Sequence, residues 1–244
     1  PDARAAGQGG HADAAPYAFL RAVEARLKED GAPVKSLLAD GSENTLTGRC
    51  WHADLLWGLE VTAWNSLQLA RVTLILADLS HVPIKANWAN NPTGSLVGLF
   101  RCWLPQTAAS LKVRLEALDL LILRDAEAAF NVLLHLSATG HQLAIPAARP
   151  KWREDDAGAG YSVTEAEFQQ MVCGVRDRLL KISADHASRL ARVLTKTFLG
   201  EPHLLREVLP LLEPFAGEGA DDADREVLRQ ALREVLHRCH NFDD

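Results

Sequence analysis

The sequence predicts an all-α protein built from stacked antiparallel helix pairs. Hydrophobic residues recur at i, i+3 and i+4 along most of the chain, and short polar turns separate the successive apolar segments. Hydrophobic residues make up 48% of the chain but aromatic residues only 6%, without the Val, Thr and Tyr alternation typical of strands. We expect an α-solenoid of the HEAT or armadillo type, whose repeats span about 40 to 47 residues. An irregular helical bundle is the alternative.

Two short helices are expected near the start of the chain. Residues 1–15 are rich in Ala, Gly and Asp and are expected to be disordered. Pro16 predicts the first turn of a helix, because proline is favoured at the first helical position. Asp30 and Gly31 predict the end of this helix, and a helical turn over 34–38 follows.

The strongest periodicity predicts a helical hairpin over 52–81. Asn65 and Ser66 interrupt the apolar pattern and predict a tight turn between the two helices. The two stripes consist of Leu55, Leu56, Leu59 and Ala63, and then Leu69, Val72, Leu76 and Leu79. About two helical turns separate successive tryptophans, so we expect them on one side of the first helix, in packing contacts. These are Trp51, Trp57 and Trp64.

Helix pairs continue after a loop that contains two prolines and three asparagines. A helix that runs to about Trp103 is expected there, with Thr93 or Ser95 as its N-cap. A further helix is expected over 110–123, and Asp125 is placed to cap its successor.

The periodicity disappears over 141–162, which is long for a loop inside a compact domain. We therefore expect a linker there, between a helical-repeat segment over 16–140 and a second helical segment over 163–244. Thr164 with Glu167 matches a capping box at the start of the second segment.

The remainder of the second segment is also expected to be helical. Pro202 predicts the start of a short helix that ends by Pro214, and acidic residues around Asp222 favour the start of a last helix.

Composition indicates which cellular environment and which classes of partner are expected. The net charge is −6, from 26 Lys and Arg against 32 Asp and Glu, which disfavours binding to nucleic acid. No apolar run approaches the roughly 20 residues of a membrane span, and no signal peptide is recognisable. We expect a cytoplasmic protein, cut from a longer chain because no initiator Met is present. Four widely spaced cysteines are expected to be buried thiols: Cys50, Cys102, Cys173 and Cys239.

No motif indicates catalysis or a cofactor. Neither the Gly-x-Ser-x-Gly of a hydrolase elbow nor the Gly-Lys of a P-loop occurs. Glu234 and His237 form one Glu-x-x-His unit, for which Asp78 with His81 is the nearest possible partner, so we expect no metal. Two histidines on apolar helices are expected to be hydrogen-bonded core residues: His52 and His135.

Several strings resemble a helical region of large, mostly uncharacterised bacterial multidomain proteins. They are WHADLLWGLE at 51–60, ANNP at 89–92, WLPQT at 103–107 and PKWR at 150–153. In that family the region accompanies nucleotide-dependent signalling modules and effector enzymes of antiphage defence. The resemblance implies a recognition or scaffold segment without catalytic residues.

We therefore expect a non-catalytic sensor or regulatory module that binds a protein partner or other domains of its parent chain. Two segments are the expected recognition elements, one with Trp88, Asn90 and Asn91, the other with Arg149, Lys151, Trp152 and Arg153. In the second, Trp152 either anchors the loop or contacts the partner. Two alternatives stay open. One is a metal-dependent enzyme using Glu234, His237 and His240, and the other is nucleic-acid binding through the basic residues of the second segment.

Overall fold

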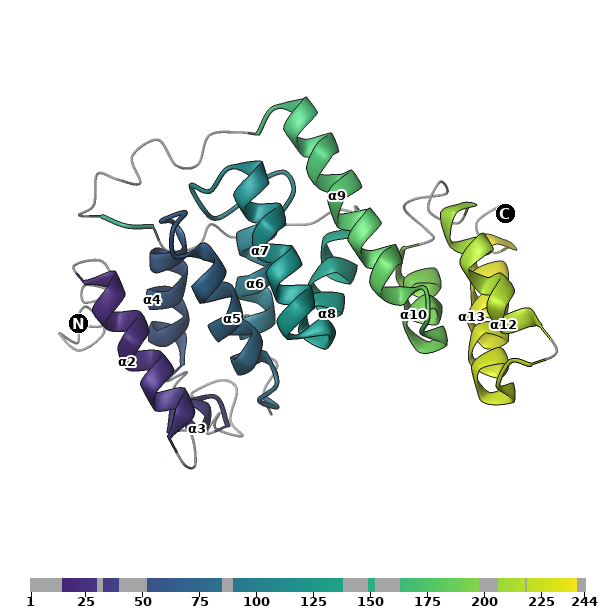
Figure 1. Cartoon of the computed structure of the whole chain (residues 1–244), viewed down its shortest axis with the longest axis horizontal. Helices are drawn as coiled ribbons and strands as arrows, with labels where there is room; N and C mark the ends of the chain where they lie inside the picture. The colour runs from purple at the N-terminus through teal and green to yellow at the C-terminus, as the bar shows by residue number, and fades with distance from the viewer. Residues whose placement is uncertain are drawn as a thin grey trace. The chain divides into compact units, whose positions relative to one another are not determined.

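The structure, a computed structural model, describes residues 15–29, 33–39, 52–84, 90–137, 149–151, 163–197, 206–217 and 219–240. Every regular element in these ranges is helical, which confirms the all-α prediction (Figure 1). The elements are α2 (Pro16–Lys28), α3 (Pro33–Ala39), α4 (Ala53–Ala63), α5 (Leu69–Ser80), α6 (Pro92–Phe100), α7 (Leu111–Arg124), α8 (Ala126–Ser137), α9 (Glu165–Ser183), α10 (Ala187–Thr197), the 3₁₀ helix η1 (Leu209–Leu212), α12 (Glu213–Ala216) and α13 (Asp222–His240).

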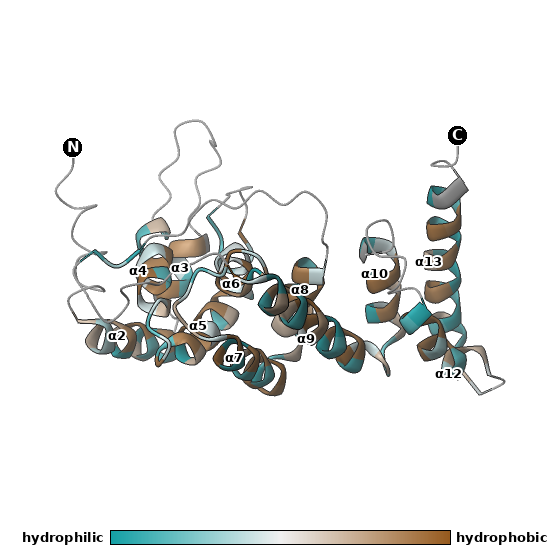
Figure 2. Ribbon diagram, turned by 90° about the horizontal axis from the view of Figure 1, so that it is seen from above, coloured by the Kyte–Doolittle hydropathy of each residue, from teal (hydrophilic) through white to brown (hydrophobic). Residues whose placement is uncertain are grey.

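The chain divides into two compact units. Unit 1 consists of Pro1–Ala129 and Ala144–Phe168, and unit 2 of Phe130–Leu143 and Gln169–Asp244. The division falls within α8 and within α9. Hydrophobic and hydrophilic residues occupy different sides of the helices, as Figure 2 shows for α13. Among the described residues, no helix combines the length and the apolar character needed to cross a bilayer.

In unit 1, α5 packs against α4, α6 and α7. The predicted stripes supply the core, because side chains one helical turn apart lie on the same face. Fully buried side chains include Leu56, Leu59, Leu69, Leu76, Leu96 and Phe100. Trp64, at the C-terminal end of α4, is also buried, with only 1% exposed. Trp57 is 43% exposed, so the prediction that the tryptophans share one packed side is wrong for this residue.

The helix caps follow from short-range hydrogen bonds. Ser110 accepts a bond from Val113 N, and Asp125 accepts one from Ala128 N, as expected for both caps. The cap of α6 is Asn91, whose side chain accepts from Gly94 N at 2.7 Å. The prediction of Thr93 or Ser95 was wrong, because proline is favoured at the first helical position, which makes Asn91, the residue before Pro92, the N-cap.

A segment without helix, 101–109, closes the C-terminal ends of two helices. The Thr107 hydroxyl donates to the Ala63 carbonyl at 2.7 Å, and Ala108 N donates to the Trp64 carbonyl at 3.1 Å. Gln106 N donates to the Gly98 carbonyl at 3.1 Å. The last carbonyls of a helix have no partner within the helix, so these bonds satisfy α4 and α6. The helix expected to reach Trp103 therefore ends at Phe100.

In unit 2, α10 packs along α13. Leu228, Ala231 and Val235 of α13 are buried, and Arg238 donates to the Thr195 carbonyl near the end of α10. Pro214 was expected to end a helix, but it lies in the first turn of α12, where its missing N–H costs no hydrogen bond.

Candidate functional site

Asn90 and Asn91, from the first predicted recognition element, lie where α6 begins. The Asn90 carbonyl accepts a hydrogen bond from His52 Nε2 at 3.0 Å, and the side chain of Asn91 caps α6. His52 is 1% exposed, which confirms it as a hydrogen-bonded core histidine. Trp88 lies outside the described residues.

Arg149, from the second predicted element, stacks on an aromatic ring. Its guanidinium carbon lies 4.7 Å from the centroid of the Trp64 ring. A cation over an indole face is attracted by the ring quadrupole, so this contact fastens 149–151 to the end of α4. Lys151 is exposed, and Trp152 and Arg153 lie outside the described residues.

The two predicted elements are at opposite ends of α4. His52 is its N-cap and Trp64 its C-cap, and the helix between them has 11 residues. At 1.5 Å per residue this separation is about 16 Å along the axis. Asn90 and Arg149 therefore do not belong to one small site.

Arg149 and Lys151 share their end of unit 1 with residues that sequence reasoning did not select. Leu67 lies in the turn after α4 and is 76% exposed, and Trp103 is 41% exposed. The Arg101 guanidinium carbon lies 5.7 Å from the centroid of the Trp103 ring. We call Leu67, Arg101, Trp103, Arg149 and Lys151 the end surface.

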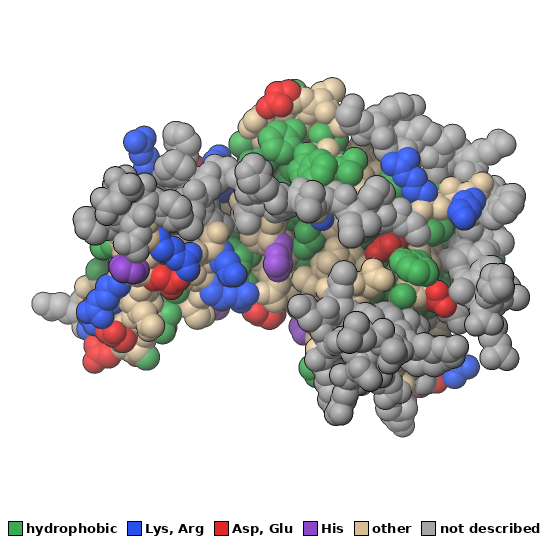
Figure 3. Space-filling view, turned by 180° about the vertical axis from the view of Figure 1, so that it is seen from behind, with side chains coloured by type: hydrophobic (Ala, Val, Ile, Leu, Met, Phe, Trp, Pro, Cys, Tyr) green, Lys and Arg blue, Asp and Glu red, His purple; other side chains and the backbone are tan. Residues whose placement is uncertain are grey.

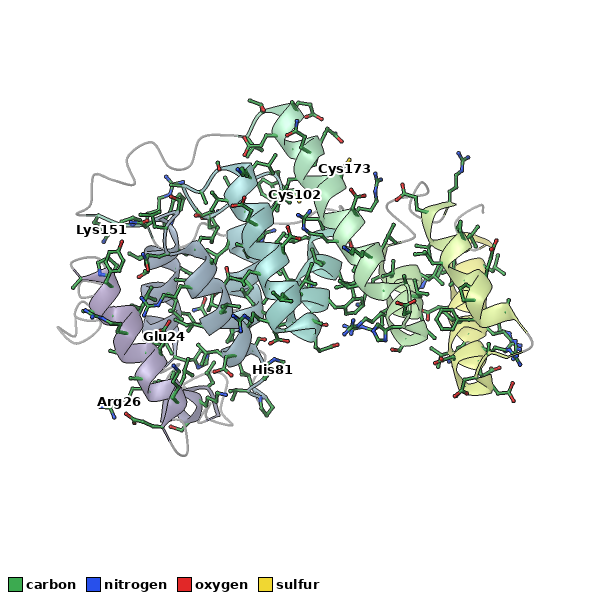
Figure 4. The ribbon with its side chains drawn as sticks, viewed as in Figure 1. Glu24, Arg26, His81, Cys102, Lys151 and Cys173 are labelled. Atoms are coloured by element: carbon green, nitrogen blue, oxygen red, sulfur yellow. The ribbon has the colours of Figure 1, made fainter. Side chains whose placement is uncertain are left out.

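Backbone hydrogen bonds hold the end surface in place. Leu67 N donates to Asn65 Oδ1 at 2.9 Å, an Asx turn that projects the leucine away from the core. The position of Trp103 is fixed by the hydrogen bonds that tie the segment 101–109 to the ends of α4 and α6. In Figure 4, Lys151 and Cys102 lie on the same side of unit 1, and His81 lies on the other.

Two large hydrophobic side chains of the end surface are exposed, Leu67 and Trp103. In Figure 3, hydrophobic side chains are exposed just below the acidic side chains at the top of the view. The available signal in the sequence was position, since Leu67 and Trp103 lie in turns and outside the helical stripes.

The chemistry of the end surface is unreactive. Burial raises the pKa of the Cys102 thiol to about 11, against the smaller opposing effect of Arg114 and Arg101. The thiol is therefore protonated at neutral pH and is a poor nucleophile. Burial also lowers the pKa of Arg101, which nevertheless stays charged.

The residues of the metal hypothesis pair with other side chains. Asp78 accepts from Lys35 at 2.8 Å, and Glu234 pairs with Arg238 one turn along α13. Among the residues that the structure describes, no three His, Cys, Asp or Glu side chains are grouped to hold a metal ion. The side chain of His240 lies outside them.

One histidine and two cysteines that were expected to be buried differ in their exposure. His135 is exposed, so the prediction of a core histidine is wrong for it. Cys173 is also exposed, whereas Cys102 is buried as expected. Both exposed residues lie on helices whose apolar side packs elsewhere. Cys50 and the side chain of Cys239 lie outside the described residues.

The chain matches no protein-family model, no curated protein and no solved structure.

Proposed function

We propose that this chain is a non-catalytic helical-repeat module that binds a protein partner through the end surface of unit 1. The observation that carries the proposal is Trp103, a large aromatic side chain that is 41% exposed and has the Arg101 guanidinium stacked on it. Trp and Arg are the residue types most enriched among the residues that dominate protein–protein binding energy.

The composition of the end surface supports the same function. Leu67 adds apolar area, and Arg149 and Lys151 add positive charge at its margin. Such a combination, with apolar anchors and a polar rim, is typical of interfaces between proteins. Because hydrogen bonds fix 101–109 before binding, little conformational entropy is lost on association.

The resemblance to bacterial multidomain proteins extends the proposal to the identity of the partner. On this hypothesis the partner is another domain of the parent chain or a second defence protein. The module would act through a change in protein contacts and not by catalysing a reaction. The stacked helix pairs of unit 1 would then form the HEAT-like scaffold that presents the end surface.

Photocrosslinking tests the proposal. p-Benzoylphenylalanine replaces Trp103 in one variant and Leu123 in the matched control, and each is irradiated in cells that express the natural parent protein. Leu123 is 78% exposed but lies near the far end of α7, about 18 Å along the helix axis from Leu111. We expect a defined crosslinked protein from position 103 and none of the same mass from position 123.

A second measurement identifies the contact. Trp103→Ala and Leu67→Ser are expected to reduce capture of the crosslinked partner by at least about tenfold, the size of a central interface residue. Crosslinks of equal yield from positions 103 and 123, or binding unchanged by both substitutions, would contradict the proposal.

A further inference from the structure

One face of α10, in unit 2, carries positive charge only. The helix contains Arg189, Arg192 and Lys196 and no carboxylate among its 11 residues. These cations follow one another at intervals of three and four residues, so they lie on one face of the helix. The apolar residues of α10 are buried on its other side. Like charges on one face attract a ligand of opposite sign, so the face is suited to an anion.

Two kinds of contact hold the arginines of this face in place. The guanidinium carbons of Arg192 and Arg189 lie 4.6 Å and 5.5 Å from the centroid of the same ring, that of Phe130 in α8. Arg192 also donates to Asn131 Oδ1 at 2.6 Å, and Arg189 donates to the Ile182 carbonyl at 3.0 Å. Both guanidinium groups are thus positioned before a ligand binds, which reduces the entropy lost on association.

A histidine at the surface of α8 senses the positive charge of this face. Desolvation lowers the pKa of His135, and the positive charges of Lys196 and Arg192 lower it further. The two cations therefore make the electrostatic potential at His135 more positive. His135, Arg192 and Lys196 are all exposed, so this potential acts where a ligand would bind.

We propose that this face of α10 binds a phosphate monoester on a protein partner, that is, a phosphoserine or a phosphothreonine. Clusters of arginine recognise phosphorylated segments, because the planar guanidinium forms paired hydrogen bonds with phosphate oxygens. A phosphate monoester carries about 1.5 to 2 negative charges at pH 7, which exceeds the charge of a carboxylate and suits a group of several cations.

Two observations favour a phosphorylated protein over other carriers of phosphate. Nucleic-acid bases stack on aromatic faces, but the Phe130 ring is 0% exposed and is already in contact with two guanidinium groups. The net charge of the chain is −6, which repels a polyanion such as nucleic acid. A single phosphate gains the local attraction and is repelled less by the rest of the chain. The site lies in unit 2 and does not depend on the end surface.

Titrations of the full chain with four ligands test the inference. The first is a short peptide with one phosphoserine between glycines, and the second is the same peptide with serine. AMP and a single-stranded oligodeoxythymidine without a terminal phosphate are the third and fourth. The ring signals of His135, assigned with a His135→Gln variant, are followed by NMR. We expect saturable binding of the phosphoserine peptide, at least about tenfold tighter than binding of the serine peptide or the oligonucleotide. AMP carries the same phosphate and is expected to bind no more tightly than the phosphoserine peptide.

The pKa of His135 gives a second measurement in the same titrations. A bound phosphate opposes the positive charges of Lys196 and Arg192, so saturation with the phosphoserine peptide is expected to raise this pKa. Binding elsewhere on the chain would leave the pKa unchanged and would overturn the assignment to α10.

Substitutions distinguish arginine recognition from general attraction. Arg192→Lys keeps the charge but removes the planar fork, and we expect it to weaken binding of the phosphoserine peptide at least about fivefold. Lys196→Gln is also expected to weaken binding. Both residues are exposed, so neither change disturbs the core. The matched control is Arg233→Gln in α13, because the Arg233 side chain is 70% exposed and its loss changes the net charge equally to the Lys196 variant.

Each contrary result overturns a stated part of the inference. Absence of saturable binding, equal affinity for the two peptides, or equal loss from Arg233→Gln and Lys196→Gln would overturn the phosphate site. Full affinity in Arg192→Lys would overturn recognition by the guanidinium. Tighter binding of AMP or of the oligonucleotide would overturn the protein partner. None of these results would affect crosslinking at Trp103.

Discussion

The guanidinium of Arg114 and the carboxylate of Glu167 form an ion pair that joins α7 to the first turn of α9. The Arg114 side chain is 1% exposed, and its Nε and Nη1 are buried without partners. The capping box expected from Thr164 and Glu167 is half formed. Glu167 N donates to Thr164 Oγ1, while the Glu167 carboxylate binds Arg114. The pair thus couples a local cap to a distant helix.

Removal of one partner of this pair is expected to destabilise the fold. Glu167→Ala leaves a buried cation without its carboxylate, which costs about 3 kcal/mol for buried pairs and less here because Glu167 is 33% exposed. Arg114→Met, of similar volume, removes the charge together with the unpartnered nitrogens and is expected to be nearly neutral. Urea unfolding of both variants checks this. Equal destabilisation by the two would show that packing, and not charge, is the important term.

Thr107 is expected to be sensitive to loss of its hydroxyl. The hydroxyl donates to the Ala63 carbonyl and accepts from Ala109 N at 3.2 Å, and the residue is 4% exposed. Thr107→Val keeps the shape but leaves both groups unsatisfied, so we expect a loss of about 1 to 3 kcal/mol in the free energy of unfolding. Thr107→Ser keeps the hydroxyl and is the control, expected to lose less. A Val variant as stable as wild type would exclude this bond as a determinant of the end surface.

The two described cysteines are expected to differ in alkylation rate. Burial raises the pKa of Cys102 from 9.0 to about 11, so at about pH 8 its thiolate is roughly 100-fold scarcer than for an ordinary thiol. Cys173 is exposed. Variants that keep only one of these cysteines are treated with iodoacetamide and analysed by mass spectrometry. Fast alkylation of Cys102 in the folded chain would contradict its burial.

The same shift predicts a pH dependence of stability. The folded pKa of Cys102 is raised above the unfolded value, so the proton is held more tightly in the folded state. Its contribution is fully present below pH 9.0 and declines between 9.0 and about 11. We expect Cys102→Ala to flatten the unfolding free energy over that window, measured against wild type. Parallel curves of unfolding free energy against pH for the two proteins would count against a raised pKa of Cys102.

His135 is expected to titrate below the ordinary range. Its side chain is exposed in part, but the covered part of the ring is desolvated, which lowers the pKa from 6.5. The positive charges of Lys196 and Arg192 lower it further. Because the folded pKa is depressed, stability from this group is present above 6.5 and declines as the pH falls towards the folded value. Lys196→Gln is expected to raise the pKa of His135, as followed by its NMR shift. An unchanged pKa in this variant would exclude the Lys196 contribution.

The helices and several of their caps were predictable because their causes are local. The i, i+3, i+4 stripe of α5 and the side-chain caps Ser110 and Asp125 each act within one or two turns. The first turn of α2 at Pro16 has the same kind of cause. For the candidate site, the sequence pointed to Arg149 and Lys151 as residues of interest, but it did not select Leu67 or Trp103.

Only the tertiary structure decided which side chains are covered. Thr107 closes the end of α4 from 44 residues away, and Glu167 reaches Arg114 across 53. Trp57 and Trp64 have the same residue type and lie seven positions apart, yet one is exposed and the other is buried under Arg149. Periodicity determines that a helix has an apolar face, since it depends on neighbours in the chain. Whether an apolar residue is covered depends on helices distant in sequence. In α13, Val235 is buried, whereas Leu236, about 100° further round the helix, is 68% exposed.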